Sequence, residues 1–176
     1  MADVYLVRTF NFLVTLNRSS AAEEGAIGAP DASTTGDSLV DGGFQECSGL
    51  EIEMEVQDYS EGGRNDGIIR RLGRAKYQPI VLKRGMFLAP AGDLNSSLWK
   101  WFQEAVGGQV LPRRYDGIVH VLGPDGDAVA TWTFIRGLPS KIVGPALNAR
   151  TGEIAVEEIH IAHEGLRLSI PARGAS

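Results

Sequence analysis

The side chains best suited to chemistry in this sequence are three histidines and one cysteine, and their spacing does not bring them together. His160 and His163 are three residues apart, and on a strand residues i and i+3 point to opposite faces. His120 is distant from both in the sequence, and Cys47 has no adjacent histidine that could activate its thiol. We therefore expect no catalytic residue, and we interpret Cys47 as a small core residue.

The short motifs that carry most cofactor and metal chemistry are also missing. Gly62-Gly63 and Gly107-Gly108 do not stand between a strand and a helix, as phosphate-binding glycines do. Asp125 and Asp127 flank a turn glycine, but the remaining ligands of a calcium loop are absent. The sequence therefore predicts no metal site, no cofactor and no enzymatic activity.

Two sets of charged residues remain. The first is a row of carboxylates that alternate along one predicted strand, so that neighbours lie ~7 Å apart on one face; its members are Glu51, Glu53 and Glu55. This face is either simply solvated, or it lines a water-filled space or meets basic groups of a neighbouring molecule. The second set is basic and consists of Arg70, Arg71, Arg74, Lys76, Lys83 and Arg84. Few aromatic residues interleave with it, so separate acidic and basic surfaces favour self-assembly over nucleic-acid binding.

Composition narrows the class of protein further. The chain has 176 residues, 43% of them hydrophobic, a net charge of −5 and a pI near 5.2, which indicates a single domain spanning 1–176 and argues against a dedicated nucleic-acid binder. No run approaches the ~18 apolar residues of a membrane span, so we expect no membrane insertion. The N-terminus lacks a signal-peptide pattern and a single cysteine excludes an internal disulfide, so we expect synthesis in the cytosol.

Period-two alternation dominates the chain and predicts a mainly β protein. The predicted strands, in order, are 5–16, 44–47, 51–56, 76–85, 117–122, 128–136, 153–162 and 166–170. Pro79 suggests an edge or a bulge in its strand, and a change of apolar phase predicts a bulge within 153–162. Residues 123–126 predict the turn of a hairpin.

One segment, at about 96–106, reads as a helix. Its apolar residues follow a single helical face, namely Leu98, Trp99, Trp101, Phe102, Ala105 and Val106. Asn95 or Ser96 is expected to cap its first amides, and Gly107-Gly108 to end it. Three stretches show no periodicity: an acidic loop insertion at 17–43, an irregular segment at 138–147 and a flexible tail at 171–176.

Several segments, taken in order, resemble one known family. They are Phe44–Leu50 (FQECSGL), Tyr59–Gly63 (YSEGG), Tyr77–Gly85 (YQPIVLKRG), Leu98–Phe102 (LWKWF), Asn148–Glu157 (NARTGEIAVE) and His163–Leu166 (HEGL). The set is similar to motifs of the phage tail tube family, which includes contractile-phage tail tubes and the inner tubes of phage-derived contractile injection systems. The similarity covers about 5–168, and the long 17–43 segment departs from it.

The resemblance implies a barrel-like fold of packed antiparallel sheets with one flanking helix. Such subunits close into hexameric rings that stack into a hollow tube, which conducts DNA or effector cargo and catalyses nothing. The implied partners are other copies of the chain, a sheath protein, and baseplate, hub and tube-cap proteins. The particle is assembled in the bacterial cytoplasm and can be released outside the cell.

On this resemblance, the charged residues fall at the lumen or at ring interfaces. The assigned residues are Glu51, Glu53, Glu55, Arg70, Arg71, Arg74, Lys83 and Arg84, and a loop at 61–76 would reach a neighbouring ring or subunit. A tube initiator or baseplate adaptor of the same fold is the alternative. A small β-barrel enzyme or ligand-binding module would need convergent polar groups in a pocket, and a basic-patch nucleic-acid binder would show salt-sensitive DNA binding.

Overall fold

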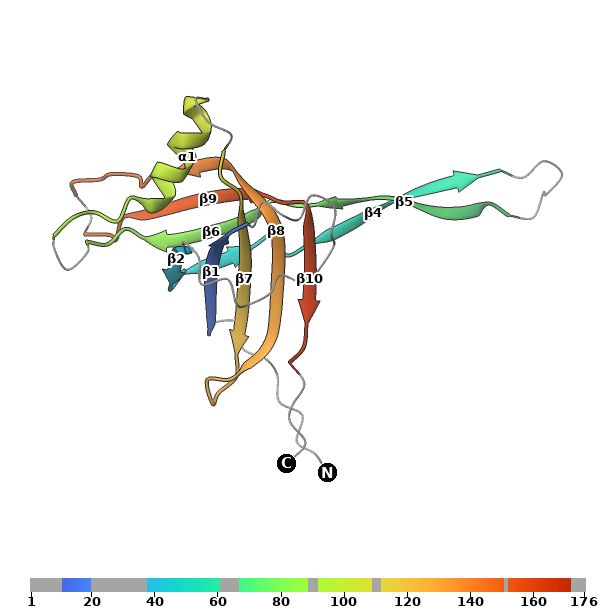
Figure 1. The fold of residues 1–176 in the computed structure, drawn as a ribbon, viewed down its shortest axis with the longest axis horizontal. Coiled ribbons are helices and arrows are strands. Elements are labelled where there is room, and N and C mark those ends of the chain that lie inside the picture. The colour runs from blue at the N-terminus through green and yellow to red at the C-terminus, as the bar shows by residue number, and fades with distance from the viewer. Residues whose placement is uncertain are drawn as a thin grey trace.

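Antiparallel strands make up most of the protein (Figure 1). The computed structural model describes residues 11–19, 38–60, 67–88, 92–108, 112–150 and 152–171. Their elements are β1 (Phe12–Arg18), β2 (Ser38–Gly42), β3 (Glu46–Ser48), β4 (Ile52–Tyr59), β5 (Ile69–Tyr77), β6 (Ile80–Gly85), α1 (Ser97–Gly107), β7 (Tyr115–Leu122), β8 (Ala128–Val143), β9 (Val156–Ala162) and β10 (Gly165–Ser169). The predicted mainly β fold with one helix is confirmed for these residues.

Eight of the strands form one continuous sheet, which we call the body together with α1. The strand order is β2-β1-β7-β8-β9-β6-β3, and β10 also pairs with β8. β2 and β3 end this path, so the described strands give the packed antiparallel arrangement that the resemblance implies without closing into a full barrel. Strands β6 and β9 run across β1, β7 and β10 (Figure 1), so the two halves of the sheet cover each other's inner faces.

The long strand β8 joins these two halves. Residues Thr131–Ile135 pair with β10, and Leu138–Val143 pair with β9. Between them, Arg136 has a φ of 55°, and its N–H donates to Asp116 Oδ1 at 2.7 Å. The predicted irregular segment at 138–147 is therefore wrong as far as Val143. Simple alternation does not predict this part of the strand, because Pro139 and a register shift before Lys141 interrupt the pattern.

The core lies between the two halves and under the helix. Its fully buried residues come from both halves; they include Val14, Leu16, Ile80, Leu82, Val119, Phe134, Ile159 and Ile161. These core residues occupy alternate positions of their strands, because every second residue of a strand points inward. Burial of each large aliphatic or aromatic side chain contributes roughly 1.5–3 kcal/mol.

Helix α1 closes one side of this core. Its N-terminus is held by Asn95, whose Oδ1 accepts the N–H of Ser97 at 3.3 Å, and it ends at Gly108 in a left-handed conformation. Leu98 and Trp101 are buried. The Trp101 indole N–H donates to the carbonyl of Arg113 at 2.8 Å. The ring is therefore buried, and its one polar group still has a hydrogen-bond partner.

Several strand boundaries differ from the prediction. The expected 76–85 strand is two strands, because Gln78-Pro79 separates β5 from β6. The expected loop at 17–43 includes the end of β1 and all of β2, which pair with each other; residues 20–37 of that loop, residues 1–10 and most of the predicted tail lie outside the described residues. The predicted loop at 61–76 is largely strand β5 from Ile69 onward.

The bulge predicted within 153–162 is also wrong. Strand β9 pairs with β6 without a register shift, and its buried positions are Glu157, Ile159 and Ile161. A buried glutamate therefore occupies a core position. The apparent change of apolar phase comes from this one charged residue, whose partner Arg84 lies on β6.

Candidate assembly interface

The hairpin of β4 and β5 is a separate two-stranded sheet that projects from the body along the longest axis of the molecule (Figure 1). Ile52 pairs with Tyr77, and Val56 pairs with Leu72, with a register shift between them. Within that shift, Glu55 faces two residues of β5, Gly73 and Arg74, which is the pattern of a β-bulge. A two-stranded sheet with nothing packed on it is marginally stable in water, so the hairpin is the feature of this fold that most needs a partner.

One face of the hairpin is apolar and open to solvent. Alternation and the register place Ile52, Met54, Val56 and Leu72 on this face. Their exposed fractions are 50%, 44%, 55% and 68%. A contiguous exposed stripe of this kind marks an interaction surface in a soluble protein. We call these four residues the apolar face of the hairpin.

The opposite face carries charges of both signs in cross-strand positions. Glu53 pairs with Lys76, and Gln57 pairs with Arg71. The Arg71 guanidinium lies 5.0 Å from the centre of the Tyr59 ring, a cation–π contact. Glu55 shares the face of Glu53 by alternation. Two members of the predicted carboxylate row, Glu53 and Glu55, therefore lie on β4 as expected, but β5 brings basic residues opposite them, so the face is of mixed charge.

The predicted basic set is divided by the structure. Arg70 and Arg71 are adjacent on a strand and so point to opposite faces. Arg70 Nε lies 3.5 Å from Asp58 Oδ1, and both side chains are exposed. Arg74 lies at the bulge opposite Glu55, and Glu51 immediately precedes β4. These hairpin residues share one element, but they do not form a single patch.

The last two predicted residues lie on β6, in the body. Lys83 Nζ contacts Glu46 Oε2 at 3.0 Å and Glu158 Oε2 at 3.7 Å, and its hydrogen bond to Glu46 raises the pKa of the lysine. Arg84 is inside the subunit: its side chain is 3% exposed, and its Nε donates to Glu157 Oε1 at 2.6 Å. The charge of Arg84 is therefore matched within its own chain and is not presented at a surface.

The root of the hairpin is held against the body by two close contacts. Gly49 has a φ of +84°, and a Cβ there would lie 2.0 Å from the carbonyl oxygen of Pro79, so only glycine fits. His163 Nε2 lies 3.0 Å from the carbonyl oxygen of Gln78, and its ring centre is 5.3 Å from that of Tyr77. Burial lowers the pKa of His163, although hydrogen bonds to the carbonyls of Gln78 and Gly165 oppose this effect.

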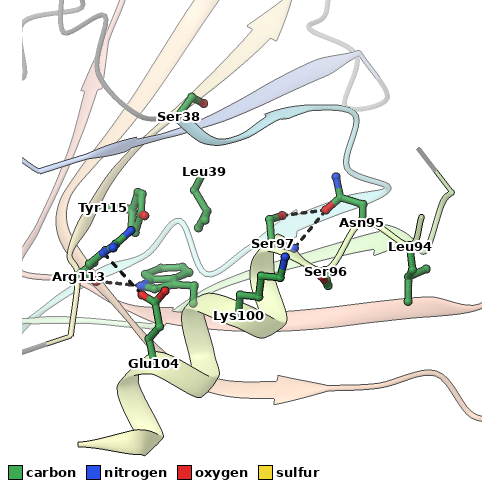
Figure 2. A pocket seen from close by; sticks show the side chains of 11 residues that line it. Ser38, Leu39, Leu94, Asn95, Ser96, Ser97, Lys100, Glu104, Arg113 and Tyr115 are labelled. Atoms are coloured by element: carbon green, nitrogen blue, oxygen red, sulfur yellow. Dashed lines mark hydrogen bonds and ion pairs between the residues drawn. The ribbon is translucent and has the colours of Figure 1, made fainter. Parts of the chain in front are cut away.

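A pocket of about 400 Å³ lies on the body, between α1, β2 and the start of β7 (Figure 2). None of its lining residues belongs to the hairpin. Four of its polar side chains are engaged in pairs: Asn95 Oδ1 accepts from the Ser97 hydroxyl at 2.9 Å, and Arg113 pairs with Glu104 at 3.7 Å. Among the described residues, no cluster of three or more histidine, cysteine or acidic side chains could hold a metal ion. No described helix is long and apolar enough to cross a membrane.

Sequence reasoning missed the apolar face as a functional surface. The strict alternation of acids and apolar residues in 51–56 indicates an amphipathic strand, and the usual conclusion is that the apolar side is buried. In the structure every residue of β4 is exposed. The signal was present in the sequence, but the layer that would cover this face is absent from the described part of the chain.

Solved structures with this architecture come from contractile injection systems. The chain is similar to a chain in the 6-fold symmetrised anti-feeding prophage baseplate, with a TM-score of 0.71 and 20% identity over 95% of this chain and 97% of that one. A chain in the tube-terminating cap of the anti-feeding prophage gives 0.71 and 19% over 97% and 95%. A chain in the sheath-tube complex of the PVC extracellular contractile injection system, in its extended state, gives 0.69 and 19% over 95% and 93%.

These likenesses show that the chain shares its fold with chains of such particles. A sequence profile described as T4-like virus tail tube protein gp19 matches residues 8–167, and the chain therefore belongs to that family. A comparison with curated protein sequences gives no match. The predicted membership of the phage tail tube family is confirmed.

Proposed function

We propose that this chain is a structural subunit of the hollow inner tube of a contractile phage tail or phage-derived injection system. Copies close into hexameric rings, and the rings stack into a tube that conducts DNA or effector cargo. The observation that carries this proposal is the exposed apolar face of the hairpin, because a partner must cover it and the family supplies other copies of the same chain as that partner.

The polarity of the hairpin suggests which side meets water in the tube. The apolar face would be covered by a neighbouring subunit, together with Arg70 at its outer end. The mixed-charge face, with Glu53, Glu55, Arg71 and Arg74, would line the water-filled lumen, and Glu51 would lie at the start of that lining. Cross-strand pairing of opposite charges leaves this lining weakly charged overall. Lys83 would lie on the body, and Arg84 would act only within the subunit.

The proposed partners follow from the assembly. They are further copies of the chain, a surrounding sheath protein, and baseplate, hub and cap proteins at the two ends. The particle would form in the bacterial cytoplasm. A tube initiator or baseplate adaptor is the second candidate, because the likeness to a baseplate chain, with a TM-score of 0.71, is as high as the likeness to a chain of the sheath-tube complex, with 0.69.

Electron microscopy of the concentrated, purified protein, combined with its mass by light scattering, tests the proposal. We expect six-fold rings or hollow tubes for the natural chain and monomers for Val56→Asp, which places a charge on the apolar face. Lys100→Asp on helix α1 is the matched control and should still assemble. If the natural chain neither polymerises nor docks onto preformed baseplates at any concentration, the tube assignment fails; docking as one ring only would favour the adaptor.

A further inference from the structure

A second group of exposed apolar residues lies at the end of the body where β6 stops and β9 begins. Phe87, Leu88, Leu94 and Ile154 are 49%, 68%, 48% and 78% exposed. We call these four residues the end cluster. Scattered exposed hydrophobic residues need no explanation, but residues grouped on adjoining segments mark a contact surface.

The end cluster is held in place by the backbone. Leu88 and Leu94 form an antiparallel bridge, and the N–H of Asn95 donates to the carbonyl of Phe87 at 3.1 Å. The N–H of Met86 donates to the carbonyl of Ala155 at 2.7 Å, which fixes this segment beside Ile154. The platform is therefore formed before any partner arrives, and binding to it costs little ordering entropy.

The buried ion pair of Arg84 and Glu157 also contacts the end cluster, through its arginine. The Arg84 guanidinium lies 5.4 Å from the centre of the Phe87 ring, and its Nη2 donates to Asn95 Oδ1 at 3.2 Å. Arg84 thus joins the residue before α1 to the aromatic member of the end cluster. This gives the buried arginine a role at an interface without placing its charge on the surface.

The end of β6 and the start of β9, which border the end cluster, lie at the opposite end of the longest axis from the hairpin (Figure 1). Each copy therefore carries two unlike apolar surfaces, one on the hairpin and one on the body. A contact between unlike surfaces of identical copies is heterologous, and it repeats from copy to copy until the assembly closes or continues as a filament.

Charge supports the pairing of these two surfaces. Arg70, on the side of the apolar face, has a side chain that is 76% exposed, and its Nε lies 3.5 Å from Asp58 Oδ1. The exposed acids Asp93 and Glu153 flank the end cluster in the sequence. We propose that the apolar face of the hairpin of one copy packs on the end cluster of the next copy, with Arg70 directed toward Asp93 or Glu153. This inference rests on the proposed function, since it names the partner surface within that assembly.

Crosslinking between copies that each carry one introduced cysteine tests the contact. Leu72→Cys and Leu88→Cys copies are mixed, assembled and treated with a short bismaleimide. Burial raises the pKa of the Cys47 thiol to about 11, so the natural cysteine reacts slowly at neutral pH. We expect a covalent dimer that contains both variants. A mixture of Leu72→Cys with Leu168→Cys is the control, because Leu168 is 54% exposed on β10, and it should give no dimer.

The outcomes separate the two proposals. The contact between the hairpin and the end cluster would be wrong if rings or tubes formed without a crosslink between Leu72→Cys and Leu88→Cys copies. It would also be wrong if Leu72→Cys copies alone gave dimers. In both cases the tube assignment would remain. A chain that never assembles would overturn the tube assignment itself. A charge exchange adds a second test. Arg70→Glu should raise the critical concentration for assembly at least tenfold. Adding Glu153→Lys or Asp93→Lys to that variant should lower the critical concentration most of the way back to the natural value. Failure of both exchanges would remove the proposed role of Arg70.

Discussion

Strands β6 and β4 both begin with apolar residues at alternate positions, Ile80 and Leu82 in one and Ile52 and Met54 in the other, but these positions lie in opposite environments. In β6, Ile80 and Leu82 are fully buried, because the other half of the sheet covers them. In β4, Ile52 and Met54 are 50% and 44% exposed, because no described element packs on the hairpin. The same local pattern therefore produces a core strand in one place and an unpartnered surface in another. The difference lies in where the covering layer comes from.

Arginines show the same contrast. Arg84 on β6 is enclosed with Glu157, so its charge contributes to the structure of one subunit. Arg71 on β5 contacts the face of Tyr59 on the projecting hairpin. Stability of the isolated subunit should therefore depend on the body alone, and assembly should depend on the hairpin.

Truncation of a buried aromatic side chain should have the largest effect on the stability of the isolated subunit. Phe134→Ala removes a fully buried side chain, and the cavity should lower the free energy of unfolding by about 3–5 kcal/mol. Leu72→Ala, at a side chain that is 68% exposed, should change it by less than about 0.5 kcal/mol. Urea unfolding of the monomeric protein measures both. Similar losses for the two variants would mean that the hairpin belongs to the cooperative core.

Breaking the internal ion pair should rank next. Arg84→Met leaves Glu157 buried without its partner, and Glu157 Oε2 already lacks a hydrogen bond among the described residues, so we expect a loss of about 3 kcal/mol. Arg84→Met with Glu157→Leu should recover most of that loss, because it removes both charges. Arg71→Met is the matched change on the hairpin and should leave the urea midpoint unchanged. A double variant no more stable than Arg84→Met would contradict this account of the pair.

The junction between the two regions should be sensitive to one methyl group. Gly49→Ala places a Cβ against the carbonyl oxygen of Pro79, so the backbone must shift, at a cost of about 1–3 kcal/mol. Gly126 has nearly the same φ, +85°, but open space around it, so Gly126→Ala should cost only about 1 kcal/mol. Gly49→Ala should also impair assembly, since the hairpin would leave the body in a different direction. Equal stability and normal tubes for both variants would show that the close contact does not fix the hairpin.

The smallest expected effect is a pH dependence at the same junction. The folded pKa of His163 is lowered below its unfolded value of about 6.5, so the folded state prefers the neutral ring. The stabilisation is present above pH 6.5 and is lost as the pH falls toward the lowered pKa. Thermal unfolding between pH 8 and pH 5 should show this loss in the natural chain and less of it in His163→Gln. His120→Gln, far from the junction, is the control and should keep the natural profile; an unchanged profile for His163→Gln would exclude this residue as the source.

The sequence predicts those parts of the fold whose partners are local. Helix α1 follows from the spacing of Leu98 and Trp101, and the β7–β8 hairpin follows from alternation around a Gly-Pro-Asp-Gly turn. The second half of β8 could not be predicted in the same way, because Pro139 and a bulge interrupt the alternation there. The burial of Glu157 could not be predicted from its neighbours in the chain, because Arg84, which neutralises it, is 73 positions away.

The candidate interface was predictable only in part. Alternation gives the row of glutamates on β4, but the bases opposite them depend on a register with a bulge at Gly73-Arg74. The exposure of Ile52, Met54 and Val56 could not be derived from periodicity, since periodicity gives the apolar side of a strand and not what covers it. Family resemblance supplied the expectation of self-assembly, and the hairpin gives that expectation a physical reason.

Amide hydrogen exchange of the hairpin, measured before and after assembly, tests whether β4 and β5 receive their stabilising contacts from neighbouring copies and not from their own subunit. We expect rapid exchange of the β4–β5 amides in the monomer, strong protection of the same amides in rings or tubes, and unchanged protection of β6 to β9 in both states. Hairpin amides that are as protected in the monomer as those of the body, or that stay unprotected in the assembled tube, would contradict the account.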